Sequence, residues 1–169
     1  MNNINWKDYT IHDKDSIKGL FGKFRPLSNF HICDVWYEGG LYPSSEHAFM
    51  AAKTLDLETR QKFHKDAFDG IDYIPTLTCA EAKQLGREIV LRKDWEDIKY
   101  DVMLNIVFNK FSHNYDIRNL LLNTGNKYLE ETNSWHDQIW GNCICEKCAS
   151  IEGQNNLGET LMKVREALQ

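Results

Sequence analysis

The sequence is poor in proline and in long apolar segments. Its 169 residues include three prolines, and no internal repeat, low-complexity tract or Pro/Gly/Ser-rich linker interrupts them. A membrane span requires an apolar run of about 18 to 20 residues, and none occurs. Residues 1–15 also lack the apolar stretch of a secretory signal. We therefore expect a cytoplasmic protein that has no membrane as a partner.

An excess of positive charge is also absent. The formal net charge is -5, from 25 acidic and 20 basic side chains. This balance argues against a protein that holds duplex nucleic acid by its overall charge, although local contacts with phosphates are not excluded. The hydrophobic fraction of 42% is sufficient for a core, and the length is that of one ordinary domain. We expect an N-terminal arm over residues 1–18 and a single domain over residues 19–169.

Local patterns predict a mainly helical chain with a small sheet. Two short strands should flank a turn at Glu38-Gly39-Gly40. A capping box of Thr78 and Glu81 predicts the start of one helix, and Asp94 is expected to cap the next. A strand is expected at residues 127–131, and helices at residues 45–55, 58–68, 79–92, 95–111, 116–124 and 157–168. The predicted fold class is α+β, a single mainly helical domain with a small β-sheet.

The segment YPSSEHAFMAAK contains the first candidate catalytic residue, Glu46. An acid in the first turn of a helix can simply complement the helix dipole. Helical spacing, however, places Glu46 on one face with Phe49 and Met50, and Lys53 follows on the same face. A carboxylate beside apolar groups can have a raised pKa and act as an acid or a base. The neighbouring His47 points elsewhere and is expected to be packed or at the surface.

The segment SWHDQIWGN contains a second candidate set. Asp137 lies between the indoles of Trp135 and Trp140, and Gly141 follows. Indoles next to an acid suit a pocket that stacks a planar ring and performs chemistry at its edge. The alternative is a pair of core tryptophans in a buried loop. The surrounding loop is long for a compact domain, and such loops are usually functional or mobile.

Several basic side chains are candidates for binding a phosphate. Lys83 and Arg87 lie four residues apart on one expected helix face, Arg92 and Trp95 follow them, and Arg25 lies in FRPLSNF. Arginine suits this role because its guanidinium makes bidentate contacts with phosphate. The alternative is a solvated helix face, which is the commoner place for any single base.

The segment GQNNLGETLM carries a weaker signal. Asn155 and Asn156 precede the last expected helix, where an asparagine can act as a cap. The free backbone N–H groups at the start of a helix can also bind an anion. The adjacent glycines would allow a ligand to approach the backbone closely.

Three of the five cysteines form the pattern C-x-C-x-x-C at Cys143, Cys145 and Cys148. Zinc sites usually have four ligands, so a structural zinc here would need a fourth from Cys33, His31 or His136. The spacing is not one of the common zinc-ribbon forms, and the alternative is a set of reduced structural thiols. We expect no disulfide framework and no catalytic cysteine, because no cysteine stands beside an obvious base.

Seven segments, taken in order, resemble the YbiA-like, or NADAR (NAD- and ADP-ribose-associated), family. They are FRPLSNF, YEGGLYPSSEHAFMAAK, AKQLGREIVLRKDW, VMLNIVFNKF, LLLNTGNKYLEE, DQIWG and GQNNLGETLMKVREAL. Each segment alone is a weak signal, and their order carries the resemblance from about Phe21 to the C-terminus. The segment NCICEKCASIE departs from the family's pattern as an insert that could shape a substrate lip or bind a metal.

The resemblance implies a hydrolase that cleaves an N-glycosidic bond to ribose. The implied substrates are ADP-ribose on a modified guanine, with ADP-ribosylated nucleic acid as a partner, or a phosphoribosylamino-pyrimidine of riboflavin synthesis. The alternative is a non-catalytic module that binds ADP-ribose or NAD. No redox cofactor is expected, and no G-x-G-x-x-G follows a strand, so a Rossmann-type NAD site is not supported. The oligomeric state stays open.

The resemblance also implies site residues. Glu46 is expected to be the leading catalytic residue, with Asp137 and Trp140 in the pocket. The expected substrate-binding residues are Arg25, Ser28, Asn29, Lys53, Lys83, Arg87, Trp95, Gly141 and Asn155.

Overall fold

The structure is a computed structural model that describes residues 9–66, 76–148 and 150–169. The chain divides into two compact units. The central unit comprises Asn29–Asn114, and the terminal unit comprises Met1–Ser28 together with Tyr115–Gln169. The expected boundary between residues 18 and 19 stays a prediction, although two strands of the terminal unit precede it.

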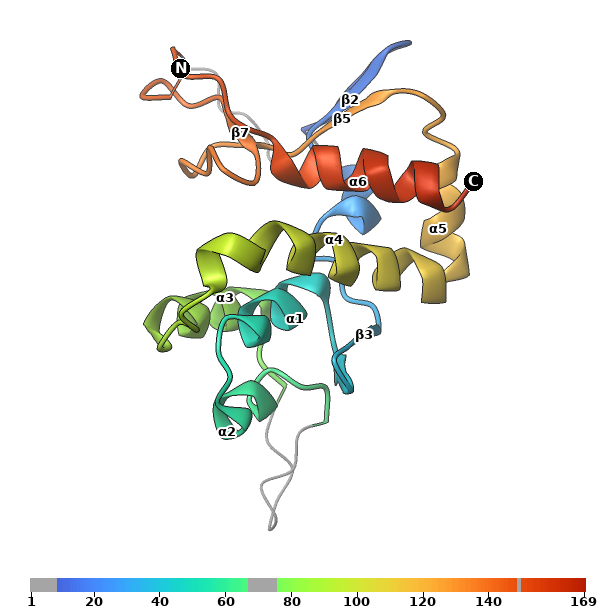
Figure 1. The fold of residues 1–169 in the computed structure, drawn as a ribbon. Helices are drawn as coiled ribbons and strands as arrows, with labels where there is room; N and C mark the ends of the chain where they lie inside the picture. The colour runs from blue at the N-terminus through green and yellow to red at the C-terminus, as the bar shows by residue number, and fades with distance from the viewer. Residues whose placement is uncertain (1–8, 67–75, 149) are drawn as a thin grey trace. The chain divides into compact units, whose positions relative to one another are not determined.

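The terminal unit contains a three-stranded sheet with the order β1-β2-β5. β1 (Ile11–His12) is antiparallel to β2 (Ser16–Lys18), which is parallel to β5 (Tyr128–Glu130). The helix α6 (Asn156–Ala167) lies against β5 (Figure 1). Its buried side chains include Leu157, Leu161 and Val164, as the helical spacing predicts, whereas Leu168 is only half-buried.

The remaining elements of the terminal unit are short. The 3-10 helix η1 (Gly22–Leu27) contacts α5 (Tyr115–Leu122). The strands β6 (Thr132–Asn133) and β7 (Asn142–Cys143) pair in parallel within the segment that sequence patterns identify as an irregular loop.

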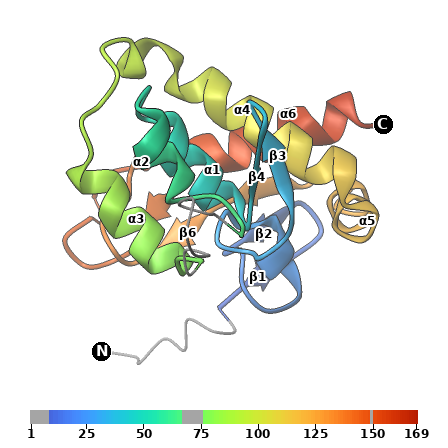
Figure 2. The same ribbon diagram turned by 90° about the horizontal axis from the view of Figure 1, so that it is seen from below.

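The central unit is built around one short helix. Its elements are β3 (Val35–Tyr37), β4 (Gly40–Tyr42), α1 (Ser45–Ala52), α2 (Leu57–Gln61), α3 (Cys79–Glu88) and α4 (Trp95–His113). α1 contacts α2, α3, α4 and the β3–β4 hairpin, and β3 of the hairpin packs against α4, which the hairpin crosses (Figure 2). Every residue of α1 is buried, and Ala48, Ala51 and Ala52 allow its neighbours to approach closely. A helix enclosed on all sides is the centre of a core.

Two of the expected local signals are confirmed by backbone geometry. The antiparallel hairpin places Tyr37 opposite Gly40, with left-handed φ angles at Glu38 and Gly39. The capping box is also present: Thr78 Oγ1 accepts a hydrogen bond from Glu81 N, and a Glu81 carboxylate oxygen lies 2.7 Å from Thr78 N. Both signals are local, which is why the sequence pattern predicts them well.

Other expectations need correction. The helices expected at residues 45–55 and 79–92 end at Ala52 and Glu88. The helix expected at residues 58–68 is α2, which ends at Gln61, and residues 67 and 68 lie outside the described residues. Asp94 precedes α4 but does not cap it through its side chain. Its carboxylate instead accepts from Arg92 Nε at 2.7 Å and Nη2 at 3.0 Å, because an arginine two residues away competes for it.

The α+β class is confirmed by helices and small sheets in both units. Among the described residues, no helix combines the length and apolar character that crossing a membrane requires.

Gly86 of α3 sets how closely this helix approaches α1. A Cβ atom at position 86 would lie 2.2 Å from Met50 Sδ and 3.0 Å from Met50 Cβ. We predict that Gly86→Ala lowers the free energy of unfolding by about 1–3 kcal/mol, because overpacking outweighs the gain in helix propensity. Thermal unfolding of the variant, compared with the exposed control Glu88→Ala, measures the effect. Equal stability of Gly86→Ala and wild type would contradict this close packing.

Candidate functional site

Glu46 lies in the first turn of α1, and the serines before it shape that turn. Ser44 is the N-cap, and its hydroxyl accepts a hydrogen bond from His47 N at 3.4 Å. The backbone N–H of Glu46 donates to Asn29 O at 3.1 Å. The exposed fraction of Glu46 is 6%, so the structure places a carboxylate in a buried position at the positive end of a helix.

His47 is a packed histidine, one of the two expected alternatives. Its Nε2 lies 2.8 Å from Leu77 O, and its Nδ1 lies 2.8 Å from Ser44 Oγ. A carbonyl only accepts, so Nε2 carries the proton and Nδ1 of the neutral ring accepts from the serine hydroxyl. Burial lowers the pKa of His47, and the hydrogen bond to Leu77 opposes that shift only in part. Its role is to hold α1 against residue 77.

Lys53 follows the last turn of α1 and is half-buried. Its Nζ donates to Gly86 O at 3.0 Å. Burial lowers the pKa of the Lys53 ammonium, and the charge of Glu46 acts in the opposite direction. The positive charges of Arg87 and Lys83 lower this pKa further. We call Lys53, Lys83 and Arg87 the basic cluster, because the charges of Lys83 and Arg87 both act on Lys53, as does the opposite charge of Glu46.

Aromatic side chains pack on α1 and near Lys83 of the basic cluster. The rings of Phe49 and Trp95 are 5.0 Å apart between centroids, and both side chains are buried. Lys83 Nζ lies 5.5 Å from the centroid of the Phe30 ring. Trp95 is therefore a core side chain that packs on α1, and its role as a substrate contact stays a prediction. The guanidinium of Arg92 is engaged by Asp94.

Two polar atoms beside Glu46 are buried and have no hydrogen-bond partner among the described residues. They are Asn29 Oδ1 and Ser45 Oγ. An unpaired buried polar group costs about 1–3 kcal/mol, so such groups mark positions where a ligand or water supplies the missing bond. The sequence patterns placed Asn29 among the expected substrate-binding residues but did not include Ser45. The pair Ser44-Ser45 before Glu46 could have indicated it, because a helix needs only one N-cap and the second serine is then free for another role.

In the terminal unit, Asp137 organises the DQIWG turn. Its Oδ1 accepts from Trp140 N at 2.9 Å and from Ile139 N at 3.1 Å, as an aspartate does in a tight turn. Asn133 holds the same residue from the other side, with Nδ2 donating to Asp137 O at 2.7 Å. Gly141 follows, and a Cβ there would lie 2.2 Å from Glu131 O. The segment is a hydrogen-bonded turn rather than a pair of core tryptophans, since Trp135 is exposed and Trp140 is half-buried.

The other expected binding residues of the terminal unit differ in their surroundings. Arg25 is exposed on η1, and Ser28 is buried directly after it. The Asn155 side chain donates to Leu129 O at 2.8 Å and accepts from Glu131 N at 3.0 Å. Asn155 therefore connects α6 with β5, and its role toward a substrate stays a prediction.

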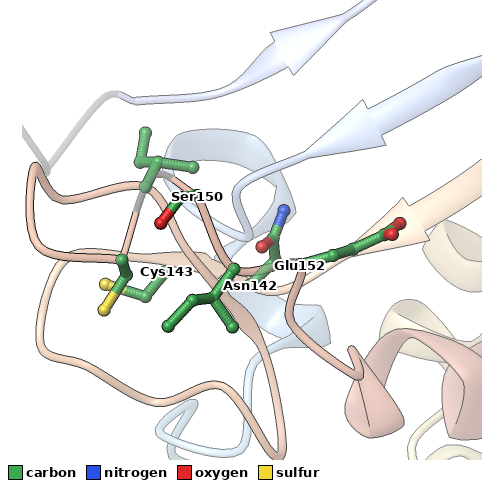
Figure 3. A pocket seen from close by; sticks show the side chains of 7 residues that line it. Asn142, Cys143, Ser150 and Glu152 are labelled. Carbon is green, nitrogen blue, oxygen red and sulfur yellow. The ribbon is translucent and has the colours of Figure 1, made fainter.

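Four potential metal ligands converge near the DQIWG turn. The donor atoms of His136, Cys143, Cys145 and Cys148 all lie within 4.8 Å of one another and could hold a metal ion. Cys33 and His31, the other expected sources of a fourth ligand, belong to the central unit. Next to the group is a cavity of about 410 Å³ that Cys143, Cys148 and Ser150 help to line. Figure 3 shows the Glu152 carboxylate pointing away from the sulfur atom of Cys143.

The profile of the NADAR domain family matches residues 11–169 of this sequence. The chain belongs to the NADAR family. The match includes every candidate site residue in both units and confirms the resemblance carried by the seven sequence segments.

Relatives of this NADAR domain have names that concern N-glycosides and riboflavin. A riboflavin biosynthesis protein of Vibrio vulnificus is 36% identical over 145 residues, which are 85% of this chain and 35% of that protein. An N-glycosidase of Nostoc punctiforme is 36% identical over 157 residues, covering 89% and 86%. The N-glycosidase YbiA of Escherichia coli (strain K12) is 33% identical over 159 residues, covering 94% and 89%. This chain thus spans about a third of the Vibrio protein and most of the other two.

A solved structure has the same fold. The NMR structure of the Escherichia coli protein YbiA matches with a TM-score of 0.73 and 28% identity, covering 96% of this chain and 90% of that one. The α+β fold class is thereby confirmed for a NADAR domain.

The buried neutral His47 predicts a dependence of stability on pH. Its pKa in the folded chain lies below the ordinary value of 6.5, so the unfolded chain binds the proton more tightly. The resulting stability is complete above about pH 6.5 and is lost as the pH falls through the folded-state pKa. We predict that the melting temperature falls between about pH 7 and pH 5 more steeply for wild type than for His47→Gln.

Thermal unfolding over this range measures the difference. The exposed control His113→Gln should follow the wild-type curve. Some slope should persist in His47→Gln, because burial also lowers the pKa of His64. Parallel curves for His47→Gln and wild type would contradict the assignment.

Proposed function

We propose that this NADAR domain is an N-glycosidase that hydrolyses the bond between C1′ of a ribose and a base nitrogen. The observation that carries the proposal is the buried carboxylate of Glu46, which interacts with the charge of Lys53 at the other end of the same helix. The names of the Nostoc and Escherichia relatives, which align over most of their length, support this reaction class. The same names support assignment as a hydrolase acting on N-glycosyl compounds.

The proposed role of Glu46 follows from the charge that develops during cleavage. The transition state of glycoside cleavage resembles an oxocarbenium ion, with positive charge on the sugar ring. A carboxylate held beside C1′ stabilises that charge and takes a proton from the attacking water. The water oxygen bonds to C1′ while the C1′–N bond breaks. The electron pair of the C1′–N bond leaves with the base nitrogen, which takes up a proton. This hydrolysis uses no redox cofactor.

The basic cluster is proposed to bind the phosphates of the substrate. Lys53, Lys83 and Arg87 provide more positive charge than Glu46 neutralises, and Lys53 is already partly desolvated. A bound phosphate would be stabilised by such groups and would fix the position of the attached ribose. Asn29 Oδ1 and Ser45 Oγ are proposed to hydrogen-bond the ribose hydroxyls, because both are buried and lack a partner among the described residues.

The other expected site residues enter the proposal through the family resemblance. Asp137 is proposed as a second carboxylate and Trp140 as a stacking side chain. Further contacts with substrate are proposed for Arg25, Ser28, Trp95, Gly141 and Asn155.

Two substrate classes fit the proposal. One is ADP-ribose joined to guanine, so that the reaction would reverse ADP-ribosylation of a nucleic acid in the cytoplasm. The other is a phosphoribosylamino-pyrimidine, which the name of the Vibrio relative supports. Both combine a ribose, a negatively charged phosphate and a planar base. The alternative function is a module that binds ADP-ribose or NAD without cleavage, in which the carboxylate would only bind ribose hydroxyls.

We predict that Glu46→Gln lowers kcat by about 100-fold or more, because it keeps the size of the side chain and removes its charge. Chromatographic analysis of product from an oligonucleotide with ADP-ribosylated guanine, and from a ribosylaminopyrimidine phosphate, measures turnover. The exposed carboxylate control Glu88→Gln should retain full activity, and the melting temperature of Glu46→Gln should stay near that of wild type. Unchanged turnover in Glu46→Gln would overturn the role of this residue. Binding without product in wild type would favour the non-cleaving module.

We predict that Lys83→Ala and Arg87→Ala each raise KM by about 10-fold or more, because each removes a charge-assisted contact with phosphate. The effect on kcat should be smaller, since the phosphate is bound in both ground and transition states. Steady-state kinetics at low and high salt measures this, and added salt should weaken substrate binding less in the variants than in wild type. The exposed control Lys93→Ala should leave KM unchanged. A fall in kcat with constant KM would argue against phosphate binding.

A further inference from the structure

The insert after the DQIWG turn brings together a complete set of metal ligands. Cys143 lies on β7, Cys145 and Cys148 lie in the turn that follows, and His136 approaches from the start of the same loop. All four donor atoms lie within 4.8 Å of one another. The ligands come from one loop of the terminal unit, so the group does not depend on the central unit.

The distances fit a tetrahedral ion. His136 Nδ1 lies 3.3 Å from Cys148 Sγ and 3.3 Å from Cys145 Sγ. A zinc ion with bonds of about 2.3 Å to sulfur and 2.0 Å to nitrogen has nitrogen–sulfur edges of about 3.5 Å. A single imidazole N–H cannot make two full hydrogen bonds to two sulfur atoms. Convergence of the nitrogen and the sulfurs on one centre is better explained by a shared ion.

The backbone near the group is held in a tight turn. Cys148 N donates a hydrogen bond to Cys145 O at 2.9 Å, which keeps two of the potential ligands close together. His136 has a φ of 67°, a conformation that residues other than glycine rarely adopt. The strain is understandable if the ring must point toward the sulfurs.

We propose that His136, Cys143, Cys145 and Cys148 bind one structural Zn²⁺ ion. Three thiolates and one imidazole are a ligand set that zinc prefers, and with all four positions filled by protein the site is closed rather than catalytic. Binding releases the three thiol protons to solvent, while the imidazole coordinates as a neutral ligand through Nδ1.

The zinc also holds the DQIWG turn. His136 directly precedes Asp137, the first residue of the DQIWG turn. Coordination of His136 would therefore fix the start of the DQIWG turn to the later turn that carries Cys145 and Cys148. Gln138 makes parallel connections, with Oε1 accepting from Cys143 N at 2.7 Å and Nε2 donating to Ile151 O at 2.7 Å. A metal cross-link over this loop restricts a segment that has little regular secondary structure.

Metal analysis of the full chain, purified under reducing conditions from zinc-containing medium, tests the site. We expect about one zinc per chain in wild type and in the control Cys33→Ser, whose thiol lies outside the group. The double variant Cys145→Ser/Cys148→Ser should contain less than about a tenth of that amount. Zinc retained by the double variant, or iron or copper in place of zinc, would overturn the assignment.

Cobalt substitution tests the site in the wild-type chain, so the result does not depend on whether the cysteine variant folds. Replacement of zinc by Co²⁺ should give thiolate-to-cobalt charge-transfer bands and the strong visible bands of a tetrahedral ion. Hydrogen exchange should become about 10-fold faster or more at residues 134–148 after chelation, with little change in α3. A chain with reduced thiols that takes up neither zinc nor cobalt would refute the proposal. Uniform exchange with and without metal would refute the role in holding the turn.

Discussion

The complete burial of α1 is the constraint on which the central unit depends. α1 is buried against α3, α4 and the β3–β4 hairpin, so each of its polar side chains needs a hydrogen-bond partner from the protein, a ligand or a buried water. Ser44 and His47 satisfy one another, and His47 also reaches Leu77. Ser45 Oγ has no such partner among the described residues. This division separates the side chains that hold the helix from those that we propose to bind the substrate.

The burial of α1 also determines which charged groups must lie near Glu46. A carboxylate removed from water is tolerated when other groups stabilise its charge, and Glu46 has the helix N-terminus and the ammonium of Lys53. Lys53 in turn donates to the carbonyl of Gly86, where α3 packs closely on Met50 of α1. The absence of a Cβ at position 86 thus determines how near α3 brings Lys83 and Arg87 to α1. A bound anion would complement the remaining positive charge.

In the terminal unit, hydrogen bonds from side chains to the backbone hold the loop that carries the DQIWG turn. This loop has two short strands among its described residues, β6 and β7, and its other order comes from side chains bonded to backbone groups. Asn133 and Asp137 define the DQIWG turn, and Asn155 joins α6 to β5. Such bonds position a loop without enclosing it in a core, which leaves the loop accessible to ligands. The proposed zinc adds a cross-link to the same loop, so fold and metal would act together on the segment that carries Asp137 and Trp140.

Local chemistry in the sequence by itself determined the β3–β4 hairpin, the Thr78–Glu81 capping box and the place of Glu46 at a helix start, because each depends on residues close together in the chain. The sequence also determined the family, through the order of seven segments along the chain. The predicted helix cap at Asp94 was wrong, because Arg92 binds the Asp94 carboxylate instead. Only the tertiary structure decided that Trp95 packs in the core, that Ser45 has no partner among the described residues, and that His136 completes the ligand group. These outcomes depend on which distant segments meet and on the direction of each side chain, and short-range spacing encodes neither.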